Sequence, residues 1–179
     1  MGADHFELLG LPRRYVLDPR ELEKRYQGLA KETHPDRFAQ SGDAERRQAL
    51  LRSTALNEAY RTLRAPLRRA AYLVGLHGVP IDGQDRDGRS AVPLPPEFLG
   101  HFLSFRVECA EASPERAAAL RSEAETDRSG LLKQLEEALD GLGDSPEHAR
   151  VLTAAQLLLE LRYYDRFLAE LEPDDEDRL

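Results

Sequence analysis

The residues of this sequence best suited to chemistry are His34 and Asp36, which flank Pro35 in a charged stretch. A histidine beside a carboxylate can act as a general base with its orienting partner, and a rigidly held aspartate can bind an arginine of another protein. No serine or cysteine nucleophile stands beside them in the sequence, and no glycine-rich phosphate-binding loop occurs. An exposed turn would also leave the reacting groups in contact with water, whereas an active site is usually a pocket that excludes it. We therefore expect a recognition motif and not the active site of an enzyme.

The remaining residues that could hold a metal or a cofactor lack the necessary spacing. The five histidines are scattered along the chain and are expected at the surface: His5, His34, His77, His101 and His148. Cys109 is the single cysteine, which excludes an internal disulfide and leaves too few thiolates to hold an iron–sulfur cluster. The sequence therefore predicts no metal site and no cofactor.

Composition favours an all-α protein, because 32% of the residues are charged, tryptophan is absent and Ala, Leu, Glu and Arg form long tracts. No apolar run is long enough to span a bilayer, and the first residues do not resemble a signal peptide, so we expect a cytoplasmic protein without a membrane partner. Residues 1–75 carry a net charge of +4 and residues 76–179 carry −12. A charge of +4 without arginine and aromatic clusters does not indicate nucleic-acid binding.

The first half of the sequence predicts short helices around one hairpin. Residues 4–9 read as a helix ended by a glycine and a proline. Asp18 is the expected N-cap of the next helix, with Pro19 at its first position and Glu21 completing a capping box. Pro35 ends this helix, since the residue before a proline disfavours α geometry. A third helix over about 44–63 completes an antiparallel hairpin with the tripeptide at its tip, and a short fourth helix begins at Pro66.

The second half predicts a separate helical domain. Residues 77–95 are rich in Gly, Pro and Asp and read as a linker. Three helical segments follow within 96–172, joined by short polar turns, which predicts an antiparallel three-helix bundle. Residues 173–179 form an acidic tail. The first bundle helix carries two adjacent apolar stripes, one of Phe98, Phe102, Phe105 and Cys109 and the other of Leu99, Leu103, Val107 and Ala110. One stripe is enough for a core, so the excess suggests a docking surface or a contact with the first domain.

Two stretches around the tripeptide closely resemble the J domain: KRYQGLAKETHPDRF at 24–38 and LNEAYRTL at 56–63. Two further stretches are similar to the HscB family, the J proteins dedicated to iron–sulfur cluster assembly: FELLGLPRRY at 6–15 and PLRRAAYL at 66–73, followed by Gly78. The order of a J domain, at 1–76, and an acidic three-helix bundle also matches that family. The resemblance therefore covers nearly all of the chain.

This resemblance implies a co-chaperone whose J domain binds an HscA/DnaK-type 70-kDa chaperone and stimulates its ATPase, while the bundle delivers the cluster scaffold IscU. Carried over by position, the stimulating triplet is His34, Pro35 and Asp36. The implied partners of the chaperone's acidic surface are Arg20, Lys24, Arg25, Lys31 and Arg37. Like its relatives, the chain is expected to act as a monomer.

The resemblance also places scaffold contacts at Leu99, Leu103 and Tyr163. Three positions depart from the family pattern: Gly100 stands where a methionine is common, and Ser104 and Val107 stand where carboxylates are common. The resemblance therefore supports the hydrophobic contacts of the site and leaves open whether it makes charged contacts. The same three contact residues could instead belong to the bundle core. Two other functions remain as alternatives: a J protein with a different client, and a helical adaptor that stimulates no ATPase.

Overall fold

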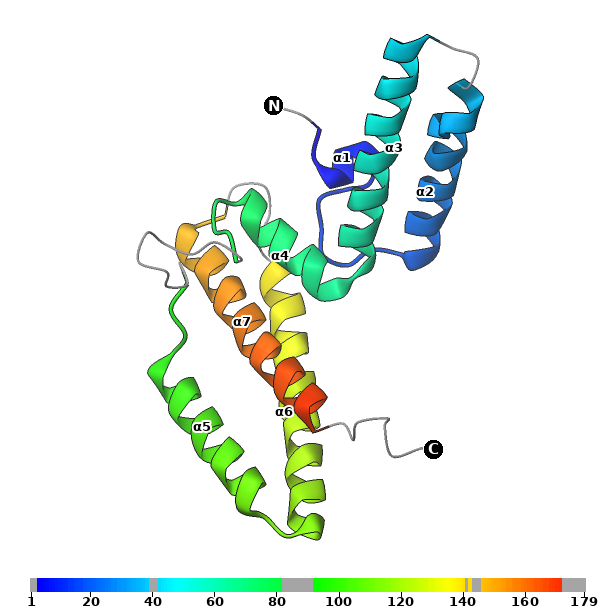
Figure 1. Ribbon diagram of the computed structural model, residues 1–179. Helices are drawn as coiled ribbons and strands as arrows, with labels where there is room; N and C mark the ends of the chain where they lie inside the picture. Colours follow the sequence, from blue (N-terminus) through cyan, green and yellow to red (C-terminus); the bar gives the residue numbers. More distant parts are fainter. Residues whose placement is uncertain (1–2, 39–41, 82–91, 141, 143–145, 172–179) are drawn as a thin grey trace, which may run out of the picture. The chain divides into compact units, whose positions relative to one another are not determined.

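The computed structural model describes residues 3–38, 42–81, 92–140, 142 and 146–171. Within these ranges the regular elements are all helical, and no strand occurs (Figure 1). The elements follow in the order α1 (His5–Leu9), α2 (Pro19–Thr33), the 3₁₀ helix η1 (Pro35–Phe38), α3 (Asp43–Arg64), α4 (Pro66–Leu76), α5 (Pro96–Glu111), α6 (Pro114–Asp140) and α7 (His148–Glu170). The predicted all-α fold is confirmed. The chain divides into two compact units, residues 1–73 and 74–179.

In the first unit, α1 is only five residues long and local hydrogen bonds fix both of its ends. The Asp4 carboxylate accepts a hydrogen bond from the backbone N–H of Glu7 at 2.8 Å, and the Glu7 carboxylate accepts one from the N–H of Asp4 at 3.1 Å. Gly10 ends the helix at a φ of 65°, which glycine adopts without strain. Phe6 and Leu9 are fully buried. The predicted short helix is confirmed.

The beginning of α2 follows the sequence prediction in part. The Asp18 carboxylate accepts a hydrogen bond from the backbone N–H of Arg20 at 2.9 Å, and Pro19 is the first helical residue. The predicted capping box is absent, because the Glu21 carboxylate instead accepts a hydrogen bond from the Arg25 guanidinium at 2.6 Å, one turn further along. The cap therefore depends on Asp18 alone.

The helices α2 and α3 lie side by side and run in opposite directions, as predicted (Figure 1). The rings of Tyr26 and Tyr60 stack with their centroids 4.1 Å apart. The Tyr26 hydroxyl donates to the side chain of Asn57 at 2.9 Å, and the Tyr60 hydroxyl donates to the Glu23 carboxylate. These contacts join the two helices from one polar edge, while Leu22 and other apolar residues are buried between them. Side-chain contacts thus join the two helices on the part of the hairpin away from His34.

Two leucines of α3 give a direct test of which face of this helix is buried. Leu63 is 0% exposed and Leu51 is 65% exposed. We expect Leu63→Ala to lower the free energy of unfolding by about 2–5 kcal/mol, because the substitution leaves a cavity. The same change at Leu51 should alter it by less than about 0.5 kcal/mol. Native-state hydrogen exchange of the α3 amides measures both values, and equal losses in the two variants would contradict this assignment.

In the second unit, the three helices α5, α6 and α7 run in alternating directions, as the short connections predicted (Figure 1). Their buried cluster contains Phe102, Phe105, Cys109, Leu120, Ala124, Tyr164 and Phe167. α6 and α7 pack most closely. α5 contacts α7 through large aromatic rings, such as those of Phe102 and Phe167, whose centroids lie 5.8 Å apart. The phenylalanine stripe of α5 is therefore the one that forms the core.

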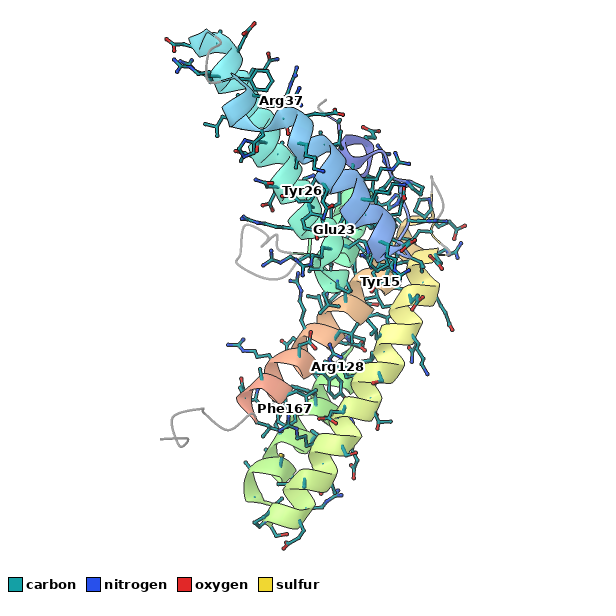
Figure 2. The ribbon with its side chains drawn as sticks, turned by 90° about the vertical axis from the view of Figure 1, so that its right-hand side faces the viewer. Tyr15, Glu23, Tyr26, Arg37, Arg128 and Phe167 are labelled. Carbon is teal, nitrogen blue, oxygen red and sulfur yellow. The ribbon has the colours of Figure 1, made fainter. Side chains whose placement is uncertain are left out.

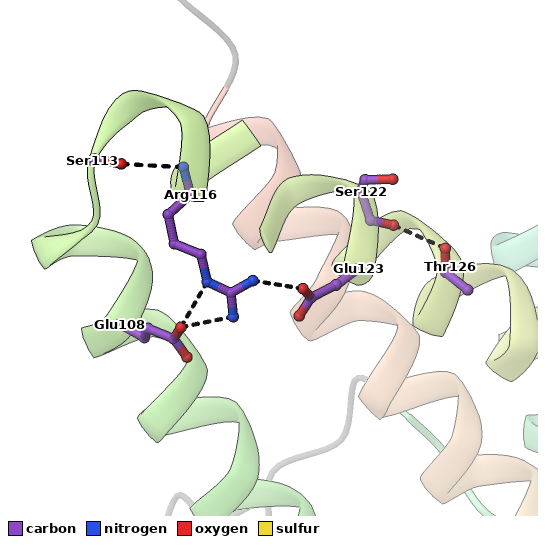
Figure 3. Close-up of polar contacts among 6 residues, drawn as sticks. All are labelled: Glu108, Ser113, Arg116, Ser122, Glu123 and Thr126. Atoms are coloured by element: carbon purple, nitrogen blue, oxygen red, sulfur yellow. Dashed lines mark hydrogen bonds and ion pairs between the residues drawn. The ribbon is translucent and has the colours of Figure 1, made fainter. Parts of the chain in front are cut away.

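Arg116, near the start of α6, fixes the turn between α5 and α6 (Figure 3). Its guanidinium contacts the Glu108 carboxylate of α5 at 2.8 Å and the Glu123 carboxylate of α6 at 2.8 Å. Both ion pairs are partly exposed, so each contributes little free energy, but together they hold the ends of two helices in one geometry. Glu108 is consequently not a free negative charge on the outer surface of α5.

The two ends of the predicted linker, residues 79–81 and 92–93, are packed and not simply solvated. Val79, Ile81 and Val92 are buried, and the backbone carbonyl of Pro93 accepts a hydrogen bond from the Gln156 side chain at 3.0 Å. The central part of the linker, residues 82–91, and the acidic tail at 173–179 lie outside the described residues. No helix in the described ranges combines the length and the apolar character needed to cross a membrane.

Candidate functional site

The turn that carries His34 is formed where α2 ends. The backbone of His34 has φ −59° and ψ 129°, outside helical geometry, as expected for a residue before proline. The carbonyl of His34 accepts a hydrogen bond from the N–H of Arg37 at 3.1 Å, which closes the 3₁₀ turn η1. The His34 side chain is exposed. The side chains of Pro35 and Asp36 are outside the described part of the structure, so their placement stays a prediction.

The predicted basic residues of α2 are exposed. Arg20, Lys24 and Lys31 recur at helical spacing and share one face of the helix. Arg25 lies beside this face but is paired with Glu21, which reduces the charge it offers to a partner. Arg37, labelled in Figure 2 at the end of the hairpin, donates a hydrogen bond to the Lys31 carbonyl at 3.4 Å. A cationic surface therefore runs along α2 to the turn at His34.

The predicted scaffold contacts lie in the second unit, and two of them are exposed. Leu103 is 62% exposed and Tyr163 is 42% exposed, whereas Leu99 is half-buried. Leu103 and Tyr163 are therefore not simple core residues. Val107, on the same stripe of α5, is 58% exposed. The leucine stripe of α5 is the one left outside the core.

The contacts between α5 and α7 bring these residues to one edge of the bundle. The Tyr163 ring of α7 packs edge-on against the rings of Phe98 and Phe102, with centroid distances of 5.9 Å and 5.6 Å. Each phenylalanine directly precedes one of the two leucines, Leu99 and Leu103, in the sequence. Arg106 follows these leucines on the same face, and its guanidinium contacts Glu170 of α7 at 2.6 Å. Leu99 and Leu103 therefore recur with Arg106 on one face of α5, beside the phenylalanine stripe that Tyr163 contacts.

Carboxylates border this apolar surface on its other side. A shallow depression on α5 is lined by Leu103, Ser104, Val107, Glu108 and Glu111. Because Glu108 is paired with Arg116, Glu111 is the carboxylate better able to meet a basic group. The positions of Ser104 and Val107 themselves are exposed and uncharged. The surface is consequently uncharged at these two positions, where the family resemblance implies carboxylates.

No group of three or more His, Cys, Asp or Glu side chains that could hold a metal ion occurs among the described residues. The prediction that the histidines all lie at the surface is wrong for His5. Its ring is half-buried and stacks on Tyr72 with the centroids 4.2 Å apart, and burial lowers the pKa of His5. The backbone N–H of His5 also donates to the Tyr72 hydroxyl at 2.9 Å. This histidine joins α1 to α4 and is structural.

Comparison with known proteins agrees with this arrangement. Residues 4–72 match the family model described as DnaJ domain, and residues 94–172 match the one described as HSCB C-terminal oligomerisation domain. A protein of Bordetella pertussis named "Co-chaperone protein HscB homolog" is 41% identical over 143 residues, which is 79% of this chain and 81% of that protein. A protein of the same name from Aeromonas hydrophila is 36% identical over 94% of both chains.

Two solved structures extend the similarity to the fold. The structure titled "Chaperone HscB from Vibrio cholerae" has a TM-score of 0.73 and 31% sequence identity, and the match covers 99% of this chain and 100% of that one. The crystal structure of human co-chaperone protein HscB has a TM-score of 0.74 and 28% identity over 94% of this chain and 80% of that one. The resemblance to a J domain followed by a helical HscB-type domain is confirmed.

Proposed function

We propose, since this chain belongs to the HscB family of J-domain co-chaperones, that it stimulates ATP hydrolysis by an HscA/DnaK-type 70-kDa chaperone and delivers the iron–sulfur cluster scaffold IscU to it. One observation supports this function most directly. His34 is exposed where α2 ends, on the hairpin whose outer face carries Arg20, Lys24 and Lys31. In this role the chain performs no catalysis itself.

The chemistry of the turn fits stimulation of a partner ATPase. Pro35 restricts the backbone between His34 and Asp36, where α2 ends. A carboxylate at Asp36 can compete for an arginine of the chaperone by forming charge-assisted hydrogen bonds. If that arginine holds the chaperone in its slow conformation, binding shifts the population toward the hydrolysing one. Hydrolysis remains the chaperone's own reaction.

The apolar edge between α5 and α7 supports delivery of a protein client. Exposed aromatic and aliphatic side chains that are surrounded by charged groups are typical of the centre of a binding surface. Leu103 and Tyr163 are such residues, and the Arg106–Glu170 ion pair lies at the border of the surface. We propose IscU as this client and a monomer as the working state of the co-chaperone. A different client remains the second candidate, because Ser104 and Val107 depart from the family pattern.

Single-turnover ATP hydrolysis by the purified chaperone tests the first part of the proposal. The rate should rise when this protein is added and rise further with the protein and the scaffold together. An unchanged rate with each addition would leave only the adaptor function. Titration of the purified scaffold against the wild-type chain tests the second part, and absence of binding would indicate a different client.

The dependence of stimulation on ionic strength should show how much of the binding to the chaperone comes from charged contacts. Raising the salt from about 0.05 M to about 0.5 M shortens the Debye length severalfold, so we expect the concentration for half-maximal stimulation to rise about tenfold. Lys24→Glu should produce a similar loss at low salt. Lys133→Glu reverses the same charge on an exposed position of α6 and is expected to change little. Salt-independent stimulation would exclude α2 as the steering surface.

A further inference from the structure

An open groove lies in the first unit at the base of the hairpin, at the end opposite to His34. Its volume is about 490 Å³, which is in the range of sites for small molecules. Figure 2 labels Tyr15 and Glu23 in this part of the unit. Four side chains give the groove an apolar lining: Leu17, Pro19, Leu22 and Pro66. None of the residues that line it belongs to the surfaces proposed above for the chaperone or the scaffold.

Arg69 of α4 lines this groove as a half-buried cation. Its guanidinium lies 5.0 Å from the centre of the Tyr15 ring, and its Nη1 donates to the Leu63 carbonyl at 2.5 Å. Its Nε is buried without a hydrogen-bond partner. Within the described part of the chain no carboxylate neutralises this group, and burial lowers the pKa of Arg69. Because the charge is partly withdrawn from water, an anion gains more from it than from a fully exposed arginine.

A second guanidinium lines the same groove. Arg64 is exposed at the end of α3, and its guanidinium lies 5.9 Å from the centre of the Tyr60 ring. Glu23 is the carboxylate among the described residues of the lining. Hydrogen bonds from the Tyr60 hydroxyl and from Gln27 lower the pKa of the Glu23 carboxyl, so it stays ionised at neutral pH. Two cations and one anion leave the groove with a net positive charge.

The charge and the lining of the groove together select the chemistry of a ligand. A phosphoryl group carries nearly two negative charges at neutral pH and three acceptor oxygens, so it can accept hydrogen bonds from two guanidinium groups at once. The volume exceeds that of a phosphoryl group, and the leucine and proline side chains suit an apolar body attached to it. A free phosphate ion would leave this apolar lining in contact with water.

We propose that this groove binds a small phosphate monoester with an apolar body, whose phosphoryl group contacts Arg64 and Arg69. Phenyl phosphate is the probe, titrated into the ¹⁵N-labelled full-length protein in a buffer that contains no phosphate. The amide signals of Leu22, Tyr60 and Arg69 should shift and saturate with a Kd on the order of 1 mM, as expected for so small a ligand. The amide of Lys31, at the other end of α2, should move little. Groove signals that do not shift, or that do not saturate well above this concentration, overturn the proposal.

Three further probes separate the parts of the ligand. Inorganic phosphate lacks the apolar body and benzyl alcohol lacks the charge, so each should bind at least about tenfold more weakly than phenyl phosphate. Benzoate keeps the ring but carries a single charge, and equal affinity for benzoate would overturn the assignment of a phosphoryl group. Equal affinity for inorganic phosphate would overturn the apolar body. Shifts at Lys31 as large as those at Tyr60 would show general attraction of anions to the basic surface and overturn the site.

A variant at the groove provides the control. Arg64→Gln removes one of the two cations from an exposed position, so the wild-type melting temperature should be retained. Its affinity for phenyl phosphate should fall at least about fivefold, because one charge-assisted hydrogen bond is lost. Arg52→Gln makes the same change on an exposed position of α3 outside the groove, and it should alter the affinity less than about twofold. Equal affinities of the two variants would overturn the site. The titration requires neither the chaperone nor the scaffold, so its result is independent of the proposed function.

Discussion

A His34→Gln variant is expected to leave ATP hydrolysis by the partner chaperone at its unstimulated rate. The imidazole is exposed at the residue where α2 leaves helical geometry, and the glutamine keeps polarity and approximate size without the ring. Since the turn is fixed by Pro35 and by the hydrogen bond from Arg37 to the His34 carbonyl, the backbone should be unaffected. Single-turnover hydrolysis with saturating co-chaperone measures the effect. We expect a loss of nearly all of the stimulation.

The control for this variant is the same substitution at another exposed histidine. His148 is exposed at the start of α7 in the second unit, and His148→Gln should stimulate as the wild type does. The stability of His34→Gln should differ from the wild type by less than about 0.5 kcal/mol, because its side chain is at the surface. Scaffold binding should also be retained. Full stimulation by the His34→Gln variant would remove the main support for the proposed function.

Replacing Leu99, Leu103 and Tyr163 together by alanine should weaken binding of the scaffold by at least about 100-fold, or about 2.7 kcal/mol. Leu103 and Tyr163 expose apolar surface that a partner can bury, and Leu99, one turn before Leu103 on α5, is half-buried. The losses will not be additive, because the three residues line one edge. Isothermal titration calorimetry with the purified scaffold measures the affinity. Stimulation of the chaperone without scaffold should remain unchanged.

Tyr163 also packs against Phe98 and Phe102, so its loss can loosen the bundle as well as the binding surface. Leu103→Ala alone is the cleaner variant, since that side chain is 62% exposed, and we expect it to retain the wild-type melting temperature. Leu50→Ala/Leu51→Ala removes two comparably exposed leucines from the first unit and serves as the matched control. Undiminished scaffold binding by the triple variant would place the client on a different surface.

The sequence predicted those features that depend on neighbours along the chain. Asp18 and Pro19 begin α2, and Pro35 ends it, because caps and prolines act on the backbone within one turn. Leu56 and Leu63 of α3 recur at helical spacing, and both are buried. The placement of His34 in an exposed turn required only these local rules. The resemblance to the J domain came from residues 24–38 and 56–63, and the resemblance to HscB came from residues 6–15 and 66–73.

By itself, then, the sequence determined the helices, their order and the recognition turn, since these follow from local hydrogen bonding and periodicity. Tertiary packing decided which of the two stripes of α5 is buried: the side chains of Phe102 and Phe105 reach Phe167 of α7, and this leaves Leu103 and Val107 outside. Burial depends on which helix approaches, and that is set by contacts between residues far apart in the chain.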